Sequence, residues 1–289
     1  MGSQSKYRVF SKRQRFFRVM MYVGMLLVAL FTVLPLLYVV VTAFKPIDEI
    51  VKFPPRFFVR RPTGENFSDL LLSLESSSVP FIRFVFNSLF TTVVTVVLTV
   101  LVSAMGAFAL TKHKVPFANF LFSLIIAALM FSQHVTQIST YLVVNNLGII
   151  DTYAALIIPK IAVAFNFFLM KQFLDQMPDA FLEAARIDGA REGYIFFKIV
   201  MPFLKPAWAT LIVFSFVSNW NDYFTPLIFI TNQSLKTLPL ALQTIGESGN
   251  LARAGAMAAA TFLMTVPTIL VFTVMQKRVI ETMTHSGIK

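Results

Sequence analysis

The sequence predicts an all-α integral membrane protein with six transmembrane helices. Apolar residues make up 56% of the 289 residues and charged residues only 13%. Soluble domains average about 45–50% apolar residues and about 25% charged residues. Too few polar groups remain to build the surface of a soluble protein around so much apolar side chain. The charged residues also stand in short clusters between long uncharged runs. Together these observations make the lipid bilayer the solvent for most of the chain.

Six runs meet the requirement of about 20 mainly apolar residues for one transmembrane helix. They cover about 19–43, 84–111, 115–131, 152–170, 206–230 and 254–276. Basic residues bound the first, second and sixth runs at both ends: Arg18, Lys45, Arg83, Lys112, Arg253 and Lys277. The third run continues without a formal charge, apart from a possible one on His134, as far as Ile150. Because that stretch is too long for one span and too short for two, we expect a polar exit after residue 131 and then a short interfacial helix.

The distribution of Lys and Arg predicts that both termini lie in the cytoplasm. Sixteen of the 25 basic residues fall on the side that holds the termini and eight on the other, and cytoplasmic segments carry the excess. Residues 1–18 and 277–289 are then cytoplasmic, 45–83 is an external cap or linker, and 171–205 is the one large cytoplasmic loop. This pattern also explains the net charge of +11 as an orientation signal, so we expect no nucleic-acid partner. The first apolar run exceeds the about 7–15 residues of a signal peptide, which favours an uncleaved anchor.

The cytoplasmic loop 171–205 is predicted to contain a short helix, a sharp turn and a second helix. Pro178 suits the first turn, and Asp179 and Glu183 favour the positive N-terminal end of the first helix. Gly189 can adopt the positive φ that ends a helix. On these grounds alone, an amphipathic interfacial loop explains the segment as well as a docking element does.

This loop resembles the EAA motif of binding-protein-dependent ABC importer permeases, which reads roughly E-A-A-x-x-D-G-A, then F, I, L-P and P. The matching residues are Glu183, Ala184, Ala185, Asp188, Gly189, Ala190, Phe196, Ile199, Pro202 and Pro206. Met201 replaces the usual Leu, which is a volume-conserving change. The resemblance implies that the segment is a coupling helix that docks on a cytoplasmic ATPase. Because the two alanines would let another backbone approach closely, we expect Ala185→Trp to block that docking.

The resemblance covers essentially the whole chain, and the smaller permease subunit of the maltose/maltodextrin type is the most similar. It implies the ABC importer permease fold, import of a sugar, and a place in a bacterial cell (inner) membrane. The implied partners are a second permease subunit, an extracellular solute-binding protein and two ATPase subunits that hold ATP and Mg²⁺. The chain itself would hold no cofactor and no catalytic residue. Its tail resembles the ending of that branch, although Thr282 and Ser286 replace the usual glycines.

Two ionisable residues lie inside predicted spans, Lys160 in the fourth and Asp222 in the fifth. A charge at the bilayer centre costs about 2.5–3.5 kcal/mol on insertion scales, so such a residue faces a partner or a hydrated cavity. Each lies about eight residues from the outer end of its span, roughly 12 Å deep, so the two depths match. Two interpretations remain open: a structural ion pair or outward snorkelling, and a place on the path of the sugar.

Amide and aromatic residues near this pair suit sugar chemistry, because amides bond to hydroxyls and aromatic faces cover apolar ring faces. These candidates are Asn219, Trp220, Asn221 and Tyr223, a segment that resembles the W-N-D/E sequence common in sugar-transporting permeases. Asn166 is a weaker candidate, because on an ideal helix it points about 120° away from Lys160.

Other classes of protein find less support in the sequence. It contains no phosphate-binding loop of the form G-x-x-x-x-G-K-S/T and no H-E-x-x-H zinc motif. Its three histidines are scattered and it has no cysteine, so we expect no metal site. An ion-coupled secondary transporter stays an alternative, although it requires an inverted repeat, broken helices and ion sites. An ABC permease for a solute other than sugar is a second alternative, and a membrane-embedded enzyme is disfavoured because no catalytic set is present.

Overall fold

A computed structural model describes residues 12–75, 79–246 and 254–286. Every regular element in these ranges is a helix, as the sequence predicts. The longest are α1 (Lys12–Ala43), α4 (Phe81–Lys112), α12 (Lys205–Trp220) and α15 (Ala254–Ser286). The shorter α-helices are α2 (Ile47–Ile50), α3 (Glu65–Glu75), α5 (Ala118–Ala128), α6 (Gln133–Asn146), α7 (Tyr153–Ile161), α8 (Ala164–Leu174), α9 (Ala180–Ile187), α10 (Glu192–Ile195), α11 (Met201–Phe203), α13 (Phe224–Phe229) and α14 (Leu238–Gly246). A π-helix, η1 (Phe196–Val200), and a 3₁₀-helix, η2 (Gln233–Leu235), complete the set.

The chain divides into two compact units. The first comprises Met1–Leu70 and Asn250–Phe262, and the second comprises Leu71–Gly249 and Leu263–Lys289. Residues 1–11 and 287–289, which belong to the predicted cytoplasmic ends, lie outside the described residues.

In the first unit, the side chain of Asn66 closes the C-terminal end of α1. The last carbonyls of a helix have no partner inside it, and the Asn66 amide nitrogen donates to the carbonyls of Ala43 (2.8 Å) and Lys45 (2.7 Å). The ammonium group of Lys45 in turn donates to the carbonyl of Arg56. A β-carbon at Gly255, in the first turn of α15, would lie 2.0 Å from Asn66 Oδ1. The start of α15 therefore requires glycine beside this amide.

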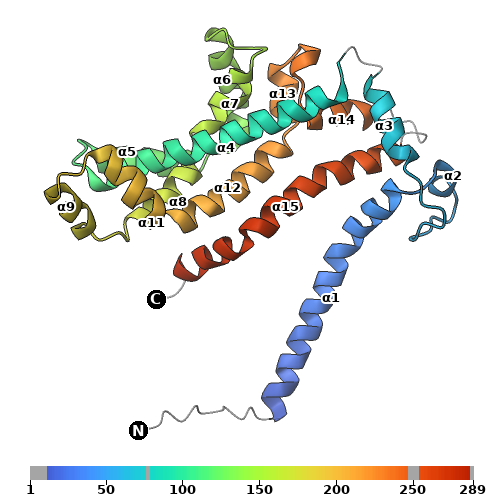
Figure 1. The fold of residues 1–289 in the computed structure, drawn as a ribbon, viewed down its shortest axis with the longest axis horizontal. Helices are drawn as coiled ribbons and strands as arrows, with labels where there is room; N and C mark the ends of the chain where they lie inside the picture. The colour runs from blue at the N-terminus through green and yellow to red at the C-terminus, as the bar shows by residue number, and fades with distance from the viewer. Residues whose placement is uncertain (1–11, 76–78, 247–253, 287–289) are drawn as a thin grey trace. The chain divides into compact units, whose positions relative to one another are not determined.

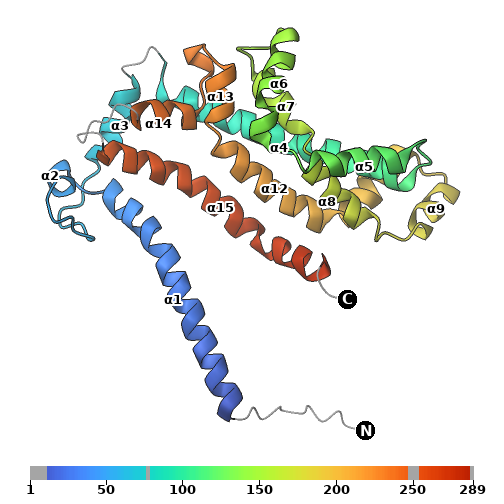
Figure 2. The ribbon, with the colours of Figure 1, turned by 180° about the vertical axis from the view of Figure 1, so that it is seen from behind.

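In the second unit, α4 packs against α12, α8, α7 and α14 (Figure 1). Its buried residues recur every three or four positions, which places them on one face of the helix. That face is rich in small and hydroxyl side chains, which allow neighbouring helices to approach closely. The views in Figures 1 and 2 show α6, α7 and α13 on the same side of α4. This arrangement brings Lys160 and Asp222, which are 62 residues apart in the sequence, into contact.

Two pairs of neighbouring helices are bent. The pair α7 and α8 bends by 43°, and the helical segment Glu192–Phe203 meets α12 at 77°. By length and composition, three described helical segments can cross a membrane: Arg13–Ala43, Phe81–Lys112 and Ala254–Gln276. Counting each bent pair as one span raises the number in the described chain to at most five. The fourth predicted span, 152–170, is thus two helices.

The third predicted span, 115–131, differs most from the structure. The helix α5 has 11 residues, about 17 Å at 1.5 Å per residue, against a hydrocarbon core of about 30 Å. Phe117 precedes it with a φ of 58°, and the chain turns after Leu129. The residues predicted as a polar exit begin the next helix, α6. The count of six spans therefore stays a prediction.

Candidate functional site

A cavity of about 670 Å³ opens in the second unit among α6, α7, α8, α12 and α13. Its wall combines hydroxyl and amide groups with aromatic rings. The aromatic lining residues are Phe131, Phe214, Tyr223, Phe224 and Phe229. Such a mixed wall can hold a ligand that has both polar groups and apolar faces.

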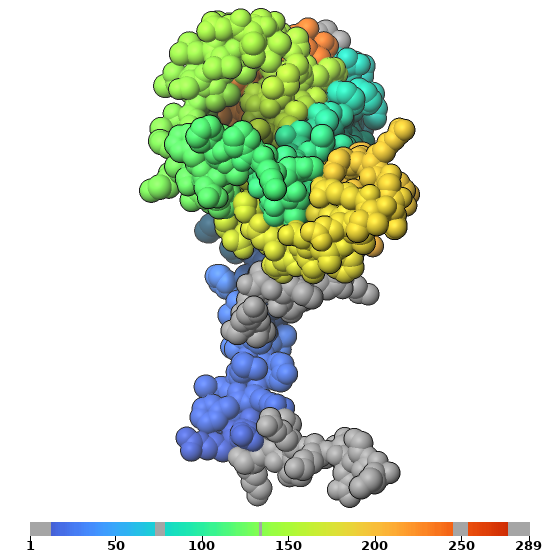
Figure 3. All heavy atoms as spheres, turned by 90° about the vertical axis from the view of Figure 1, so that its left-hand side faces the viewer, coloured from blue at the N-terminus to red at the C-terminus, as the bar shows by residue number. Residues whose placement is uncertain are grey.

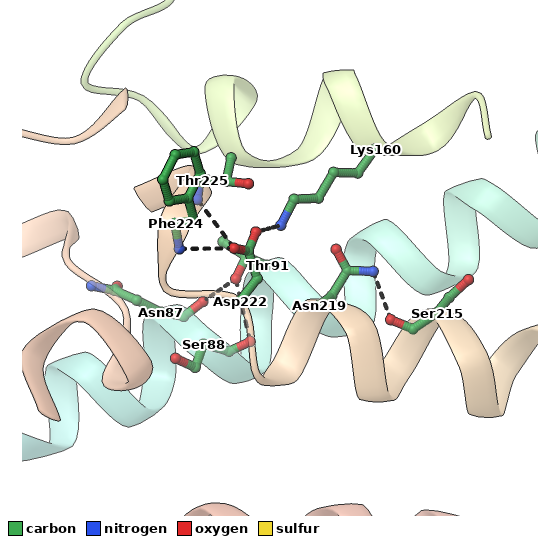
Figure 4. A network of polar contacts seen from close by, with 9 residues as sticks. All are labelled: Asn87, Ser88, Thr91, Lys160, Ser215, Asn219, Asp222, Phe224 and Thr225. Atoms are coloured by element: carbon green, nitrogen blue, oxygen red, sulfur yellow. Dashed lines mark hydrogen bonds and ion pairs between the residues drawn. The ribbon is translucent and has the colours of Figure 1, made fainter. Parts of the chain in front are cut away.

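Lys160 and Asp222 are the charged residues in the lining of this cavity, and they form an ion pair (Figure 4). The Lys160 ammonium group donates to Asp222 Oδ2, and the two side chains are 18% and 16% exposed. The pair leaves the lining without net formal charge. The sequence left two interpretations open, a structural ion pair and a place on the path of the sugar. The ion pair is present. Its position in the cavity wall is also what a place on the sugar path requires.

The bend between α7 and α8 positions Lys160. The chain is extended at Val163, with φ −97° and ψ 123°, so the last carbonyls of α7 lose their helical partners. The hydroxyl of Thr99, on α4, donates to the carbonyl of Lys160 at 3.2 Å and replaces one of those bonds. The same bend redirects Asn166, which is buried and lines the same cavity. The argument that made Asn166 a weaker candidate assumed one straight helix, and the bend removes that premise.

The interruption between α12 and α13 positions Asp222. Its Oδ1 atom accepts hydrogen bonds from the backbone N–H groups of Phe224 (2.9 Å) and Thr225 (3.1 Å), at the start of α13. These N–H groups have no partner within their own helix. One carboxylate oxygen thus holds the helix start and the other holds Lys160, which fixes the side chain in the wall (Figure 4).

Three of the other predicted residues line the cavity and one does not. Asn219, Asn221 and Tyr223 belong to the lining. Trp220 is 4% exposed, packs away from the cavity and donates from Nε1 to the carbonyl of Met264 at 3.0 Å. Trp220 is therefore not among the residues that line this cavity.

Sequence reasoning missed the contribution of α6 and part of the contributions of α12 and α13. On α6, Thr136 and Gln137 lie four and three residues before Thr140, the two spacings that bring helix side chains together on one side. Those spacings, within a segment otherwise flanked by exposed apolar side chains, are the signal that could have found them. The missed polar lining residues are Thr136, Gln137, Thr140, Ser215, Ser218 and Thr225.

The predicted helix in the loop 171–205 is present as α9, and Gly189 ends it. Gly189 has φ +79°. Its N–H donates to the carbonyl of Arg186 (3.0 Å), and the N–H of Ala190 donates to the carbonyl of Ala185 (2.9 Å). This pair of bonds is a Schellman motif, in which a residue with positive φ follows the helix. The turn therefore has the geometry for which glycine is best suited.

The two sides of α9 differ in exposure. Leu182 and Ala185 are buried in a core that also contains residues of α4 and α8. Glu183 and Ala184 are exposed, and Ile187 is 86% exposed. Ala185→Trp would therefore disturb the chain's own core, so a loss of docking in that variant could not be assigned to a contact with an ATPase. Asp188 and Pro202 are also exposed, and Ala190 is half-buried. Figure 3 shows this golden-yellow segment on the outside of the unit, beside the green α5.

Asp151 joins the connection before α7 to the connection after α13. Its Oδ1 atom accepts from the backbone N–H groups of Thr231 (2.6 Å) and Asn232 (2.9 Å), and its Oδ2 atom accepts from the Thr231 hydroxyl. The Thr231 hydroxyl, followed by the two N–H groups, lowers the pKa of the Asp151 carboxyl. Asp151 itself has φ 58°, a conformation that Asp and Asn tolerate better than most residues.

Within the described residues, no group of three or more His, Cys, Asp or Glu side chains is placed to hold a metal ion. The imidazole of His113 packs edge-on against Phe108 and lies 3.6 Å from a carboxylate oxygen of Glu192.

Curated proteins of bacteria are similar to nearly the whole chain. The polygalacturonan/rhamnogalacturonan transport system permease protein YtcP of Bacillus subtilis is 30% identical, over 92% of this chain and 95% of its own. The arabinooligosaccharides permease protein AraQ of Halalkalibacterium halodurans is 27% identical, with the same shares covered. The sn-glycerol-3-phosphate permease protein UgpE of Yersinia enterocolitica is 31% identical, over 91% and 92%.

A solved structure and a family model match as well. The fold resembles a chain of a bacterial ABC transporter involved in the import of the acidic polysaccharide alginate, with a TM-score of 0.80 and 24% identity over 93% of this chain and 98% of that one. The model of the family described as binding-protein-dependent transport system inner membrane component matches residues 103–285.

Proposed function

Because the chain belongs to the family of binding-protein-dependent transport system inner membrane components, we propose that it forms half of the path by which an oligosaccharide enters a bacterial cell. The family makes the chain a permease subunit of an ATP-driven importer in the inner membrane. A second permease subunit would supply the other half of the path, and an extracellular solute-binding protein would deliver the sugar. The chain would take no part in ATP hydrolysis itself.

One observation carries this proposal, namely the polar cavity among apolar helices. Its amide and hydroxyl groups suit the hydroxyls of a sugar, and its aromatic rings suit the apolar faces of sugar rings. The residues that we assign to the path are Lys160, Asn166, Asn219, Asn221, Asp222 and Tyr223. The relatives support a sugar cargo, since two bear the names of polysaccharide or oligosaccharide systems. A solved alginate transporter in complex with its pentasaccharide-bound periplasmic protein, with a TM-score of 0.58, supports delivery by a binding protein.

The exposed side of α9 supports a contact with the ATPase subunits, which would hold ATP and Mg²⁺. Glu183, Ala184 and Ile187 form that side, and Gly189 fixes the direction in which the chain leaves it. The opposite side of α9 is embedded in the core beside α4, so a force applied to α9 reaches the spans directly. We therefore assign α9 as the coupling helix.

The proposal is tested with the purified complex of this chain, its second permease subunit and the ATPases, reconstituted in liposomes with the binding protein. We expect ATP hydrolysis to rise when a sugar-loaded binding protein is added, together with uptake of the sugar. Ala184→Trp and Ile187→Asp, on the exposed side of α9, should abolish this stimulation. A complex that imports sugar without ATP, or whose stimulation survives both changes, would contradict the proposal.

The two helix interruptions favour one other mechanism, because ion-coupled transporters bind their ions at broken helices. In this chain the ammonium group of Lys160 contacts Asp222, where a coupling cation would have to bind. The reconstituted system separates the two mechanisms, since uptake by an ion-coupled transporter would follow an ion gradient in the absence of ATP.

A further inference from the structure

Lys112, the last residue of α4, is a buried cation that holds the start of α9. Its side chain is 6% exposed. The ammonium group donates to the carbonyl of Met177 at 2.6 Å and to Asp179 Oδ1 at 2.7 Å. Met177 and Asp179 immediately flank Pro178, at the point where the chain enters α9. Lys112 therefore fixes both the backbone and a side chain at that entry.

Asp179 occupies the N-cap position of α9, where an aspartate usually accepts hydrogen bonds from the first N–H groups of its own helix. Here its side chain makes no such bond, and its carboxylate accepts from Lys112 instead. The carboxylate is 71% exposed, whereas the ammonium group is enclosed. The ion pair thus links an exposed carboxylate next to α9 to the enclosed ammonium group at the C-terminal end of α4.

We propose that Lys112 is the positioning residue through which movement of α9 reaches α4. The inference rests on the proposed function, in which the ATPases displace α9 during their cycle. Apolar contacts of Leu182 and Ala185 with the core resist separation of the two helices but are non-directional. The two hydrogen bonds of Lys112 are directional, and they fix the orientation of the α9 entry relative to α4.

The helix α4 leads from Lys112 to Thr99, which contacts a residue of the cavity wall. It runs for 32 residues without a proline, so it transmits displacement along its axis. Thr99 lies 13 residues before Lys112, about 20 Å along the helix. Its hydroxyl donates to the carbonyl of Lys160, whose side chain pairs with Asp222 in the cavity wall. A continuous set of bonds therefore connects the coupling helix to the charged pair of the cavity.

The test measures the ATP hydrolysed for each sugar molecule imported by the reconstituted complex. Lys112→Met keeps much of the length of the side chain but cannot donate to Met177 or Asp179. We expect this ratio to rise by about 2- to 30-fold, the range for changes along a coupled network. Lys112→Arg, which can donate to both acceptors, should return the ratio to near the wild-type value. Lys114→Met, an exposed lysine two residues further on, is the matched control and should leave the ratio unchanged.

Asp179→Asn provides a second variant, since it weakens the ion pair while the Met177 bond remains, and it should raise the ratio less than Lys112→Met does. If Lys112→Met prevents assembly, the decision rests on Asp179→Asn and Lys112→Arg. A role limited to stability would lower the amount of complex without changing the ratio, and that result would overturn the inference. A wild-type complex without sugar-stimulated hydrolysis would instead contradict the proposed function itself.

Discussion

Lys160 and Asp222 come from two different interrupted helix pairs and meet in one ion pair on the wall of the cavity. Each residue has a second bond that fixes its helix: the Lys160 carbonyl accepts from Thr99, and the Asp222 carboxylate accepts from the start of α13. The pair therefore joins the two interruptions to each other. Its charge balance and its mechanical role can be separated by substitution.

Lys160→Met and Asp222→Asn should each reduce sugar uptake. Removing one partner of a buried, hydrogen-bonded charge pair leaves the other charge uncompensated, and we expect a loss of more than about 10-fold. The amide of Asp222→Asn can still accept from the start of α13, so the helix should stay capped. The double variant should transport better than either single variant, because it restores neutrality. Full uptake by both single variants would show that the pair is not on the path.

Gly189→Val should impair coupling between ATP hydrolysis and uptake. A β-branched residue is strained at φ +79°, and the left-handed conformation costs roughly 1–2 kcal/mol for residues with a β-carbon. Gly193→Val is the control in the same loop, because nothing lies within 4 Å of a β-carbon there and its φ is not in the positive range. Sugar-stimulated ATP hydrolysis is the measurement. Equal activity of the two variants would refute a special role for the turn at Gly189.

Gly255→Ala should lower the thermal stability of the purified complex. The added carbon would lie 2.0 Å from Asn66 Oδ1, and the amide cannot move without breaking its bonds to Ala43 and Lys45. We expect a cost of about 1–3 kcal/mol, that of leaving buried polar groups unpaired. Gly24→Ala, in an exposed part of α1 with nothing within 4 Å, should be neutral or stabilising. A similar melting temperature for both variants would argue against the close contact.

Asp151→Ala should release the connections before α7 and after α13, and Asp151→Asn should do so less. The asparagine keeps an oxygen that can accept from the N–H groups of Thr231 and Asn232, whereas alanine loses every bond. Hydrogen exchange at these two amides measures the effect. Since the pKa of Asp151 lies below its ordinary value of 3.8 in the folded protein, its stabilisation is fully present above that value. The stabilisation is lost as the pH falls through the lower pKa of the folded protein. Unchanged hydrogen-exchange protection of the Thr231 and Asn232 amides below that pH would contradict the role assigned to Asp151.

Cysteine labelling tests the predicted orientation, and the chain has no native cysteine to interfere. Lys52 and Lys114 are both exposed, in segments predicted to be outside and inside. A membrane-impermeant reagent applied to sealed cells should modify Lys52→Cys and should reach Lys114→Cys only after permeabilisation. The reverse pattern would invert the topology.

The features that depend on one residue's own chemistry could be predicted from the sequence. Gly189 was expected at a positive φ because glycine lacks a β-carbon, and the structure confirms it. Lys160 and Asp222 were expected at matching depths because each lies about eight residues from the outer end of its predicted span. An ion pair was one of two interpretations for them, and the structure contains that pair. The composition was enough to predict a helical membrane protein.

The features that depend on contacts between helices could not be predicted in this way. The orientation of Asn166 follows from the bend at Val163, where a hydroxyl of another helix replaces the lost bond. The burial of Ala185 depends on which side of α9 meets the core, and a small apolar side chain suits either side. The role of Lys112 at the start of α9 could not be predicted, because its partners Met177 and Asp179 lie 65 and 67 residues away in the sequence.

The separation of Lys160 and Asp222 in the sequence sets an order of events during biosynthesis. Asp222 follows Lys160 by 62 residues, so the ribosome adds it about 3–12 s later at about 5–20 residues per second. During that interval Lys160 has no carboxylate partner, and an unpaired charge at the bilayer centre costs about 2.5–3.5 kcal/mol. The ion pair, and with it the link between the two interruptions, can therefore form only after the end of α12 has been synthesised.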